Sequence, residues 1–492
     1  MYLVLDKSYN VFKKIMDINT YPLRLSPLYT DLYQLAMGQA YFLDGTADKP
    51  AVFDYFFRTI PFGGGYVIFA GLEPLLQALE NLHFSEEDLN YLQALDFRQD
   101  FLDYLIKFRF TADIFSMKEG EVAFPLEPVI RVEGKLFEAQ LVETLLLNLI
   151  NYQSLVATKA SRMRLAAGQR VLSDFGLRRA PAQGGILASR SAIIGGFNST
   201  SNVEAARMFD LEPAGTMAHS LIESHGNELQ AFIKFVEANP QRAILLVDTY
   251  DTLRSGLPNA IKAARELEKR GLKLQGIRLD SGDLAYLSKK ARQMLDAAGL
   301  KEVKIVASNL LDELVIRSLI EQEAPIDIFG VGTRLVTGAP DAALDGVYKL
   351  AVFNGQPRMK LSDNVTKTTL PGRKQVARFS DEEGCFVADA IHLTEEDLPQ
   401  EMFHPFEPEK FLNLSRYRDE ELLTRVMEKG KRLEVENKVA RIASYCRERL
   451  SLLPPEHKRF EYPHIYKVGL SPKLLARRNN LIHRYRQNFE ES

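Results

Sequence analysis

Polar side chains recur at the ends of short apolar segments in the middle of this chain. Arginine forks suit phosphate and carboxylate, while carboxylates hold Mg²⁺ or accept hydrogen bonds from sugar hydroxyls. A phosphorylated sugar, an anionic partner and a metal would fit such groups. Taken alone, each cluster is also explained by caps and turns. The segment ends are Asp174 to Arg179, Asp248 to Asp251, Arg278 to Asp283, Ser308 with Asn309, and Gly330 to Arg334.

The stretch GTMAHSLIE, residues 215–223, places a histidine beside a predicted helix start. Ser220 followed by Glu223 matches a capping box, which predicts Ser220 as the N-cap and His219 just outside the helix. A helix N-terminus favours anions, so a histidine that handles phosphate is one interpretation. A histidine that only packs or caps is the other, and for an isolated residue it is the favoured one.

Two further features have both a chemical and a purely structural interpretation. Gly330 to Thr333 could bind a phosphate through backbone N–H groups, or could be a tight strand-to-helix connection that needs glycine. Phe175 beside Arg178 suggests a stacking face next to a cation, which suits a planar anionic ring. A single phenylalanine at a strand end is more often part of a core.

The elements that must position these residues alternate between strand and helix. Amphipathic segments such as PNAIKAARELEKRG separate apolar segments that are short enough to be strands buried on both faces. This alternation predicts a parallel sheet or barrel with helices outside, in which the carboxyl ends of the strands meet at one rim. The predicted strands are 171–176, 243–248, 274–280, 303–309 and 326–333.

Length and composition limit the class of protein. A chain of 492 residues that is 46% hydrophobic predicts two or three globular domains. A net charge of -3, from 62 basic and 65 acidic residues, argues against nucleic acid or an anionic membrane as a partner. We see no signal peptide and no run of about 18 apolar residues. Two distant cysteines, Cys385 and Cys446, fit a reducing, cytoplasmic location.

Ten segments of the chain resemble, in order, the motifs of the nicotinate phosphoribosyltransferases. They extend over roughly residues 28 to 350, and their combination is highly specific. The segments are LYTDLYQLAMGQAYF, FFRTIPFGGGYVIFAGLE, EPVIRVEG, ETLLLNLINYQSLVATKASR, DFGLRRA, GGFNSTSNVEAA, GTMAHS, VDTYDT, IRLDSGDL and FGVGTRLVT.

The resemblance implies an α/β fold of the type II phosphoribosyltransferases. We expect an N-terminal α/β domain over residues 1–140, with 1–25 as an extension. An irregular (β/α) TIM-like barrel is expected over 141–360, and a smaller C-terminal region over 361–492 that packs on the other domains. The family implies a homodimer in which the N-terminal domain completes the neighbouring subunit's site.

The resemblance also implies an activity. The phosphoribosyl group of phosphoribosyl pyrophosphate would pass to the ring nitrogen of nicotinate with inversion, giving nicotinate mononucleotide for NAD salvage. Mg²⁺ would bind the pyrophosphate, and ATP hydrolysis would be coupled to turnover through a phosphohistidine. No general base is needed for the pyridine nitrogen.

Site residues follow by motif. His219 would be the residue that ATP phosphorylates, with Arg278 and Asp280 as its catalytic companions that hold ribose hydroxyls and the pyridine site. Phe175 would stack on one side of the pyridine, and Tyr33 of the partner subunit on the other. The remaining binding residues are Arg178 near the pyridine or phosphosugar, Ser220, Asp248 near ribose or metal, and Gly332 with Thr333 at the 5′-phosphate; Asp248 and Asp280 are the metal candidates.

Ser201 would decide which pyridine is used. The nicotinamide enzymes have an aspartate at the matching position, which would repel the carboxylate of nicotinate, whereas a serine hydroxyl can donate to it. Alternatives are a nicotinamide-using relative, a catalytically silent binding protein, and an unrelated phosphosugar lyase. The lyase would want a Schiff-base lysine at a strand end, and none is apparent.

Overall fold

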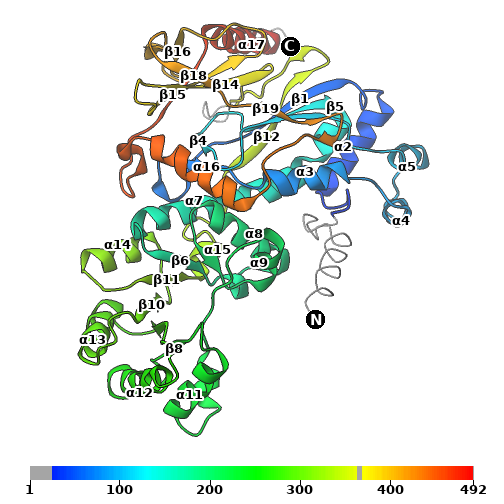
Figure 1. Ribbon diagram of the computed structural model, residues 1–492. Helices are drawn as coiled ribbons and strands as arrows, with labels where there is room; N and C mark the ends of the chain where they lie inside the picture. The colour runs from blue at the N-terminus through cyan, green and yellow to red at the C-terminus, as the bar shows by residue number, and fades with distance from the viewer. Residues whose placement is uncertain (1–24, 363–367, 491–492) are drawn as a thin grey trace, which may run out of the picture. The chain divides into compact units, whose positions relative to one another are not determined.

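A computed structural model describes residues 25–362 and 368–490. The chain forms two compact units, unit 1 from Met1–Thr158 and Ala343–Ser492, and unit 2 from Lys159–Ala342. The first boundary falls inside the long helix α7, Glu143–Ala167. The expected division at residues 140 and 360 into three domains stays a prediction. Figure 1 labels many of the elements of both units.

Unit 2 is built on a six-stranded sheet in which every neighbouring pair is parallel. Five strands are those predicted from apolar segments, and the two-residue β7 was too short to predict. The order is β7-β6-β11-β10-β9-β8. The bounds are β6 Val171–Asp174, β7 Ser199–Thr200, β8 Ile244–Leu246, β9 Gly276–Leu279, β10 Lys304–Ser308 and β11 Ile328–Val331.

The expected TIM-like barrel is not confirmed. From β8 to β7, the order of the strands is the one expected in a barrel. A closed barrel would also need β7 to pair with β8, and within the described residues these two strands do not pair. The connecting chain occupies the free edge of β7, because Thr200 donates its N–H to Glu212 O at 3.1 Å and accepts from Ala214 N at 2.9 Å. The sheet is therefore open, and the coarser expectation of a mixed α/β fold holds.

Helices connect the strands of unit 2, and Figure 1 shows α12 and α13 close to β8 and β10. The amphipathic pattern predicted for α12 is present, with Leu257, Ala260, Ala263, Ala264 and Leu267 buried. The helical elements are η2 Leu177–Arg179, α8 Ala182–Ile194, α9 Val203–Phe209, α10 His219–Glu223, α11 Glu228–Ala238, η3 Thr252–Gly256, α12 Leu257–Glu268, α13 Leu284–Ala297, α14 Glu313–Glu321 and α15 Thr333–Val336.

Unit 1 contains a seven-stranded antiparallel sheet of order β13-β12-β1-β5-β3-β19-β20. The strands are β1 Pro50–Phe57, β3 Asp113–Ser116, β5 Ile130–Lys135, β12 Gly346–Phe353, β13 Gln356–Pro357, β19 Thr424–Glu428 and β20 Lys431–Arg432. A separate pair joins β2 Val67–Ile68 to β4 Val122–Ala123. The helices of this part are α2 Leu32–Leu43, η1 Pro61–Gly63, α3 Leu72–Glu80, α4 Glu86–Ala94, α5 Gln99–Leu105 and α6 Leu136–Leu141.

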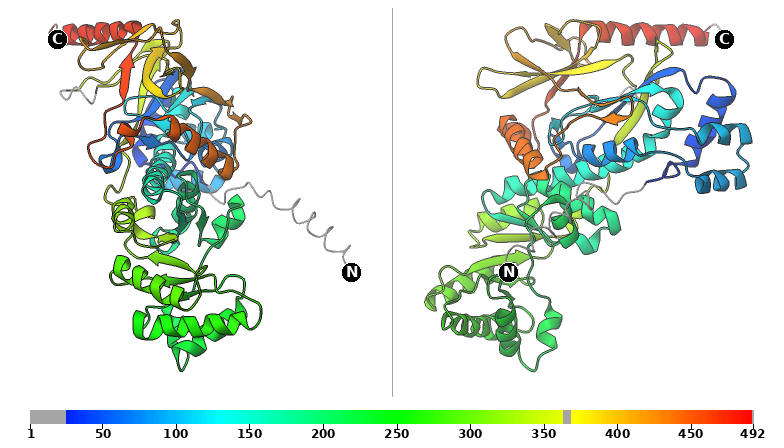
Figure 2. Two further views of the ribbon diagram at one scale, coloured as in Figure 1. Left: turned by 60° about the vertical axis from the view of Figure 1, so that its left-hand side comes forward. Right: turned by 45° about the vertical axis from the view of Figure 1, so that its right-hand side comes forward.

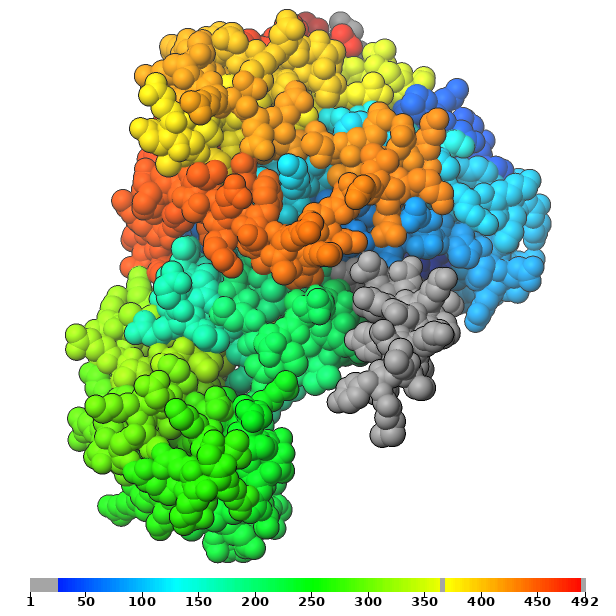
Figure 3. All heavy atoms as spheres, viewed as in Figure 1, coloured from blue at the N-terminus to red at the C-terminus, as the bar shows by residue number. Residues whose placement is uncertain are grey.

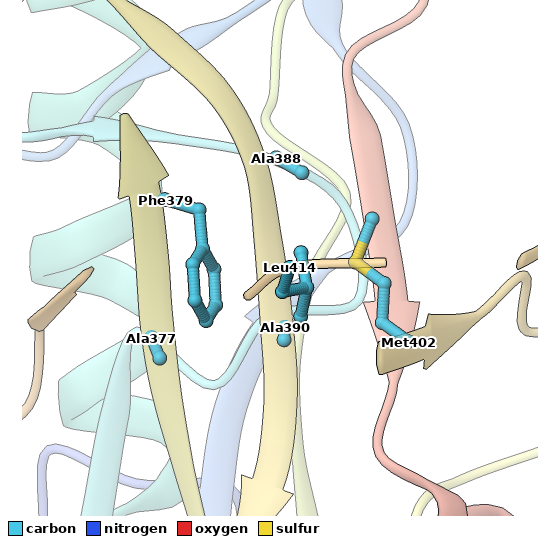
Figure 4. Packing of buried hydrophobic residues seen from close by; sticks show 6 residues of the cluster. All are labelled: Ala377, Phe379, Ala388, Ala390, Met402 and Leu414. Carbon is cyan, nitrogen blue, oxygen red and sulfur yellow. The ribbon is translucent and has the colours of Figure 1, made fainter. Parts of the chain in front are cut away.

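A second sheet of unit 1 has the order β17-β16-β21-β15-β14-β18. Its strands are β14 Lys374–Ser380, β15 Phe386–Leu393, β16 Glu401–Phe403, β17 Phe411–Asn413, β18 Arg418–Glu421 and β21 Lys467–Leu470. The helices α16 Val439–Leu452 and η5 Pro455–Lys458 precede β21 in the chain, and α17 Pro472–Glu490 follows it. Figure 4 shows Phe379, Leu414 and Met402 in its core together with three alanines. Figure 2 shows α17 lying along this sheet, and Figure 3 shows the segment from about 380 to 450 on the surface of the unit.

A buried charge network stabilises unit 1. The Arg378 guanidinium, 1% exposed, donates to Asp389 at 2.6 Å and to Glu121 at 2.6 Å. Arg449 adds a second cation beside Glu121 at 2.8 Å. Burial, followed by the nearby Asp389 carboxylate, raises the pKa of Glu127 well above its ordinary value. No helix among the described residues has the length and apolar character needed to cross a bilayer.

Candidate active site

A cavity of about 560 Å³ lies against one face of the sheet in unit 2. Its wall includes Val171 and Ser173 of β6 and Phe175 just after the strand, which alternate because successive side chains of an extended chain point to opposite faces. Ser201, which follows β7, and Thr216 of the GTMAHS motif line the same cavity. Two of the predicted pyridine-binding residues, Phe175 and Ser201, therefore share one cavity.

The ring of Phe175 lies close to Gly330 of β11. A Cβ added to Gly330 would lie 2.4 Å from the Phe175 ring, so only glycine leaves room for the ring at this position. The Arg278 guanidinium carbon lies 5.5 Å from the centre of the same ring, within the range of a cation–π contact. The cation beside the ring is therefore Arg278, and not the sequence neighbour Arg178 that was predicted to lie next to it.

Arg278 and Asp280, at the end of β9, form a fixed ion pair. Arg278 Nη2 donates to Asp280 Oδ1 at 2.8 Å, and Arg278 Nη1 donates to Thr216 Oγ1 at 2.9 Å. Arg278 Nε donates to Ser308 Oγ at 2.8 Å, and the Ser308 hydroxyl also contacts Asp280 Oδ1. Three separate segments of the chain therefore fix the guanidinium.

Asp248, at the end of β8, is tied to the loop that follows β9. Its Oδ2 accepts from Asp280 N at 2.9 Å and from Ser281 Oγ at 2.6 Å. Its Oδ1 is buried and has no hydrogen-bond partner among the described residues. A buried polar atom without a partner is costly, and at a site it marks a place for a ligand or ion.

The imidazole of His219 lies beside Thr249 and Asp280. Its Nδ1 lies 3.2 Å from Thr249 Oγ1, and its Nε2 lies 3.9 Å from Asp280 Oδ2. The imidazole is 41% exposed, so a ligand can reach it. The structure therefore brings together His219, Asp280 and Arg278, which lie up to about sixty residues apart in the chain.

The predicted capping box is wrong. Helix α10 begins at His219, its N-cap is the extended residue Ala218, and no side chain caps it. Ser220 is thus inside the first turn and exposed. His219 is the first residue of the helix and not the residue before the cap.

The four remaining predicted site residues, Gly332, Thr333, Arg178 and Tyr33, lie on other elements. Gly332 is the N-cap of the short helix α15, and Thr333 is its exposed first residue. Arg178 is exposed in the turn η2. Tyr33 lies on α2 in unit 1 with 50% of its surface exposed. Its contact with the pyridine from the partner subunit stays a prediction.

Three aspartates of the proposed rim have structural roles. Asp174 is fully buried and accepts from Gly176 N, Ser189 Oγ and Thr200 Oγ1, and burial raises the pKa of its carboxyl. Asp251 caps η3 and Asp283 caps α13 through their side chains. The interpretation of Asp283 as a cap is confirmed, while Asp280 of the same motif faces the site.

Sequence reasoning assigned no individual role to three hydroxyl residues of the site, Thr216, Thr249 and Ser308, although Ser308 was among the polar segment ends. Each lies in or beside a motif that was recognised, and Ser308 ends a predicted strand. Hydroxyl residues are common at strand ends and caps, so their type alone gave no signal. Their roles depend on distances to Arg278 and His219 that no local pattern contains.

Asp248 and Asp280 would supply only some of the ligands that a magnesium ion needs. No cluster of three or more potential metal ligands occurs among the described residues. Mg²⁺ usually binds one or two protein carboxylates together with waters and substrate phosphates. Asp248, with its unpartnered Oδ1, and the outer oxygen of Asp280 fit such a site, and bound phosphates would supply the remaining ligands.

Comparison with known proteins agrees with this arrangement. The model of the "Nicotinate phosphoribosyltransferase (NAPRTase) family" matches residues 171–394. The models of the N-terminal and C-terminal domains of nicotinate phosphoribosyltransferase match residues 28–151 and 373–477. Nicotinate phosphoribosyltransferase of Bacillus subtilis is 43% identical over 475 residues, which cover 94% of this chain and 96% of that protein.

Other relatives share the whole architecture. Nicotinate phosphoribosyltransferase of Dictyostelium discoideum is 38% identical, with 95% of this chain and 90% of that protein covered. The crystal structure of human nicotinic acid phosphoribosyltransferase aligns with a TM-score of 0.82 at 32% identity, covering 92% of this chain and 99% of that one. The likeness spans both units and all three matched regions. The chain therefore belongs to the nicotinate phosphoribosyltransferase family.

Proposed function

We propose that this protein transfers the phosphoribosyl group of phosphoribosyl pyrophosphate to nicotinate, with ATP coupled to turnover through His219. Family membership supports the transfer reaction. The observation that carries the site assignment is the meeting of Phe175, Arg278, Asp280 and His219 at the strand ends of one sheet. This group combines an aromatic face, a fixed cation, a carboxylate and a reachable imidazole.

Nicotinate binds with its ring on Phe175 and its carboxylate toward Ser201. The Ser201 hydroxyl lines the cavity that Phe175 also lines, and it donates a hydrogen bond to the carboxylate. Arg278 adds a positive charge across the ring, and Arg178 approaches from the exposed turn. Because nicotinate is an anion and nicotinamide is neutral, these donors favour the acid.

The phosphosugar lies across the carboxyl ends of β8, β9 and β11. Asp280 and Arg278 hold the ribose hydroxyls, and Gly332 with Thr333 holds the 5′-phosphate. Asp248 and Asp280 would hold Mg²⁺, which would supply positive charge to offset that of the pyrophosphate. The pyridine nitrogen attacks C1′ while the bond to the pyrophosphate oxygen breaks, so the transition state is oxocarbenium-like. Positioning and charge stabilisation then carry most of the rate.

His219 accepts the γ-phosphoryl group of ATP. The bond from the γ-phosphorus to the bridging oxygen of ADP breaks, and a bond to an imidazole nitrogen forms. Thr249 contacts Nδ1, so Nε2, which faces Asp280, is the nitrogen that would take the phosphoryl group. Hydrolysis of this phosphohistidine after transfer completes the coupled cycle.

One assay tests the transfer activity. Purified protein, phosphoribosyl pyrophosphate and Mg²⁺ are incubated with either nicotinate or nicotinamide, and mononucleotide formation is measured. We expect product from nicotinate and at least about a 100-fold lower kcat/KM with nicotinamide, as missing charge matches cost several kcal/mol. Equal rates with the two pyridines, or no product, would contradict the proposal.

A second experiment tests the role of His219. Incubation with γ-labelled ATP should place acid-labile phosphate on His219, and His219→Ala should take up none. We expect His219→Ala to retain weak transfer and lose its stimulation by ATP. Full ATP-coupled turnover by this variant would show that the histidine has no such role.

The homodimer is also part of the proposal. Tyr33 of one subunit would cover the pyridine held by Phe175 of the other, so that each site needs two chains. Mixing Tyr33→Ala with His219→Ala chains tests this, because a shared site recovers activity in the mixed dimer. Mixed dimers without recovered activity would show that each site is complete within one chain.

A further inference from the structure

The Ser308 hydroxyl connects the two charged residues of the site. Ser308 ends β10 and is only 2% exposed. Its Oγ lies 2.8 Å from Arg278 Nε, and it contacts the Oδ1 of Asp280, which is itself 2.8 Å from Arg278 Nη2. The three side chains form a closed ring of hydrogen bonds at the carboxyl ends of two neighbouring strands, β9 and β10.

The direction of these hydrogen bonds follows from the groups. The Nε–H of arginine can only donate, so Ser308 Oγ accepts from Arg278. The single hydroxyl proton is then free for Asp280 Oδ1, since the other acceptor, Leu279 O, is more distant at 3.4 Å. Asp280 Oδ1 therefore takes two donors, and Oδ2 is left on the side of His219 Nε2, 3.9 Å away.

The backbone after Ser308 is held in an unusual conformation. Asn309 has φ 81° and Leu310 has φ 50°, so two consecutive non-glycine residues are left-handed. Such conformations cost of order 1 kcal/mol or more each and persist where the surroundings require them. This strained turn directly follows Ser308, whose side chain contacts Asp280.

We propose that Ser308 is a positioning residue for phosphosugar binding, an inference that rests on the proposed function. Its hydroxyl donates to Asp280 Oδ1 and so fixes the orientation of the carboxylate. Oδ2 is then available to the ribose hydroxyls of phosphoribosyl pyrophosphate. It also holds Arg278 across Phe175, opposite the contact with Thr216. Without the hydroxyl, Arg278 Nε and Asp280 Oδ1 each lose a partner and the carboxylate can rotate.

Three variants test this role, Ser308→Ala, Ser308→Thr and the control Ser288→Ala. Ser288 is also fully buried in unit 2, but its hydroxyl donates only to Ala285 O within α13. We expect Ser308→Ala to weaken phosphoribosyl pyrophosphate binding and to lower its kcat/KM by about 10- to 100-fold, the range for a lost hydrogen bond to charged groups. Ser308→Thr should restore most of this loss, and Ser288→Ala should leave both quantities unchanged.

A double-mutant cycle separates positioning from simple stability. Binding of phosphoribosyl pyrophosphate is measured by calorimetry for Ser308→Ala with and without Asp280→Ala, alongside the melting temperature. If Ser308 acts through Asp280, its replacement costs less than about threefold when Asp280→Ala is already present. An equal loss in both backgrounds, or unchanged binding by Ser308→Ala, would overturn the inference. Wild-type protein that binds phosphoribosyl pyrophosphate but forms no nicotinate mononucleotide would instead refute the proposed function, and the cycle would still decide the role of Ser308.

Discussion

Gly330→Ala should damage nicotinate binding without direct contact with the ligand. The added Cβ would lie 2.4, 2.6 and 3.2 Å from three atoms of the Phe175 ring. Carbon atoms pack at about 3.5 to 4.0 Å, so the ring must move by about 1 Å or more. Gly330 pairs with Ser173 and Ser308 on its two sides, so the ring can move only away from the sheet and into the cavity.

This displacement sets the expected size of the effect. A shift of about 1 Å in a positioning group can reduce the rate about 100-fold, and overpacking costs about 1–3 kcal/mol. We expect kcat/KM for nicotinate to fall by about 10- to 100-fold, with a smaller change in the KM for phosphoribosyl pyrophosphate.

Steady-state kinetics with each substrate varied in turn, together with thermal melting, measure this change. Gly184→Ala is the control, because a Cβ there would lie an ordinary 3.6 Å from Pro181 within α8. A folded Gly330→Ala protein with an unchanged kcat/KM for nicotinate would refute the placement of the pyridine on Phe175.

Three further predictions concern charge. Ser201→Asp should lower kcat/KM for nicotinate at least about tenfold and raise the relative use of nicotinamide, measured with both pyridines; an unchanged ratio would exclude Ser201 as the selector. The pKa of Glu127 is raised in the folded protein, so unfolding releases a proton above the unfolded pKa of about 4.3. Its contribution to the free energy of unfolding therefore falls as pH rises above that value, and Glu127→Gln should gain stability over wild type between pH 5 and 8 in urea titrations; a difference that does not change with pH would contradict this. Arg378→Ala leaves the buried Asp389 carboxylate without its cation and should lower the free energy of unfolding by about 3–5 kcal/mol. Arg207→Ala, which removes the exposed pair with Glu204, should cost less than about 1 kcal/mol. Equal losses in the two variants would show that burial of the Arg378 network adds nothing.

The sheet of unit 2 was predictable because its strands are apolar and separated by amphipathic helices. The pattern located β6 and β8 to β11 within a few residues. It could not show that the sheet is open, since the segment around Pro213 covers the edge of β7 by backbone hydrogen bonds that carry no side-chain signal. The two-residue β7 is also too short for any periodicity.

The site was predictable in part for a related reason. Parallel strands bring their carboxyl ends together, so Arg278, Asp280 and Asp248 could be expected to meet. The same rule could not show that Asp280 faces the site while Asp174 does not. The carboxylate of Asp174 is buried and accepts hydrogen bonds from Ser189 and Thr200 instead. Start positions of short helices were equally beyond reach, and the capping box at Ser220 failed for that reason.

The central claim is that scattered strand ends form one phosphosugar site, and hydrogen exchange measures this directly. Amide exchange is followed by mass spectrometry with and without phosphoribosyl pyrophosphate and Mg²⁺. We expect simultaneous protection of the segments that contain Thr216 to Ser220, Asp248 to Asp251, Arg278 to Asp283, and Gly332 with Thr333. Protection confined to one of these segments, or located elsewhere in the chain, would contradict the account.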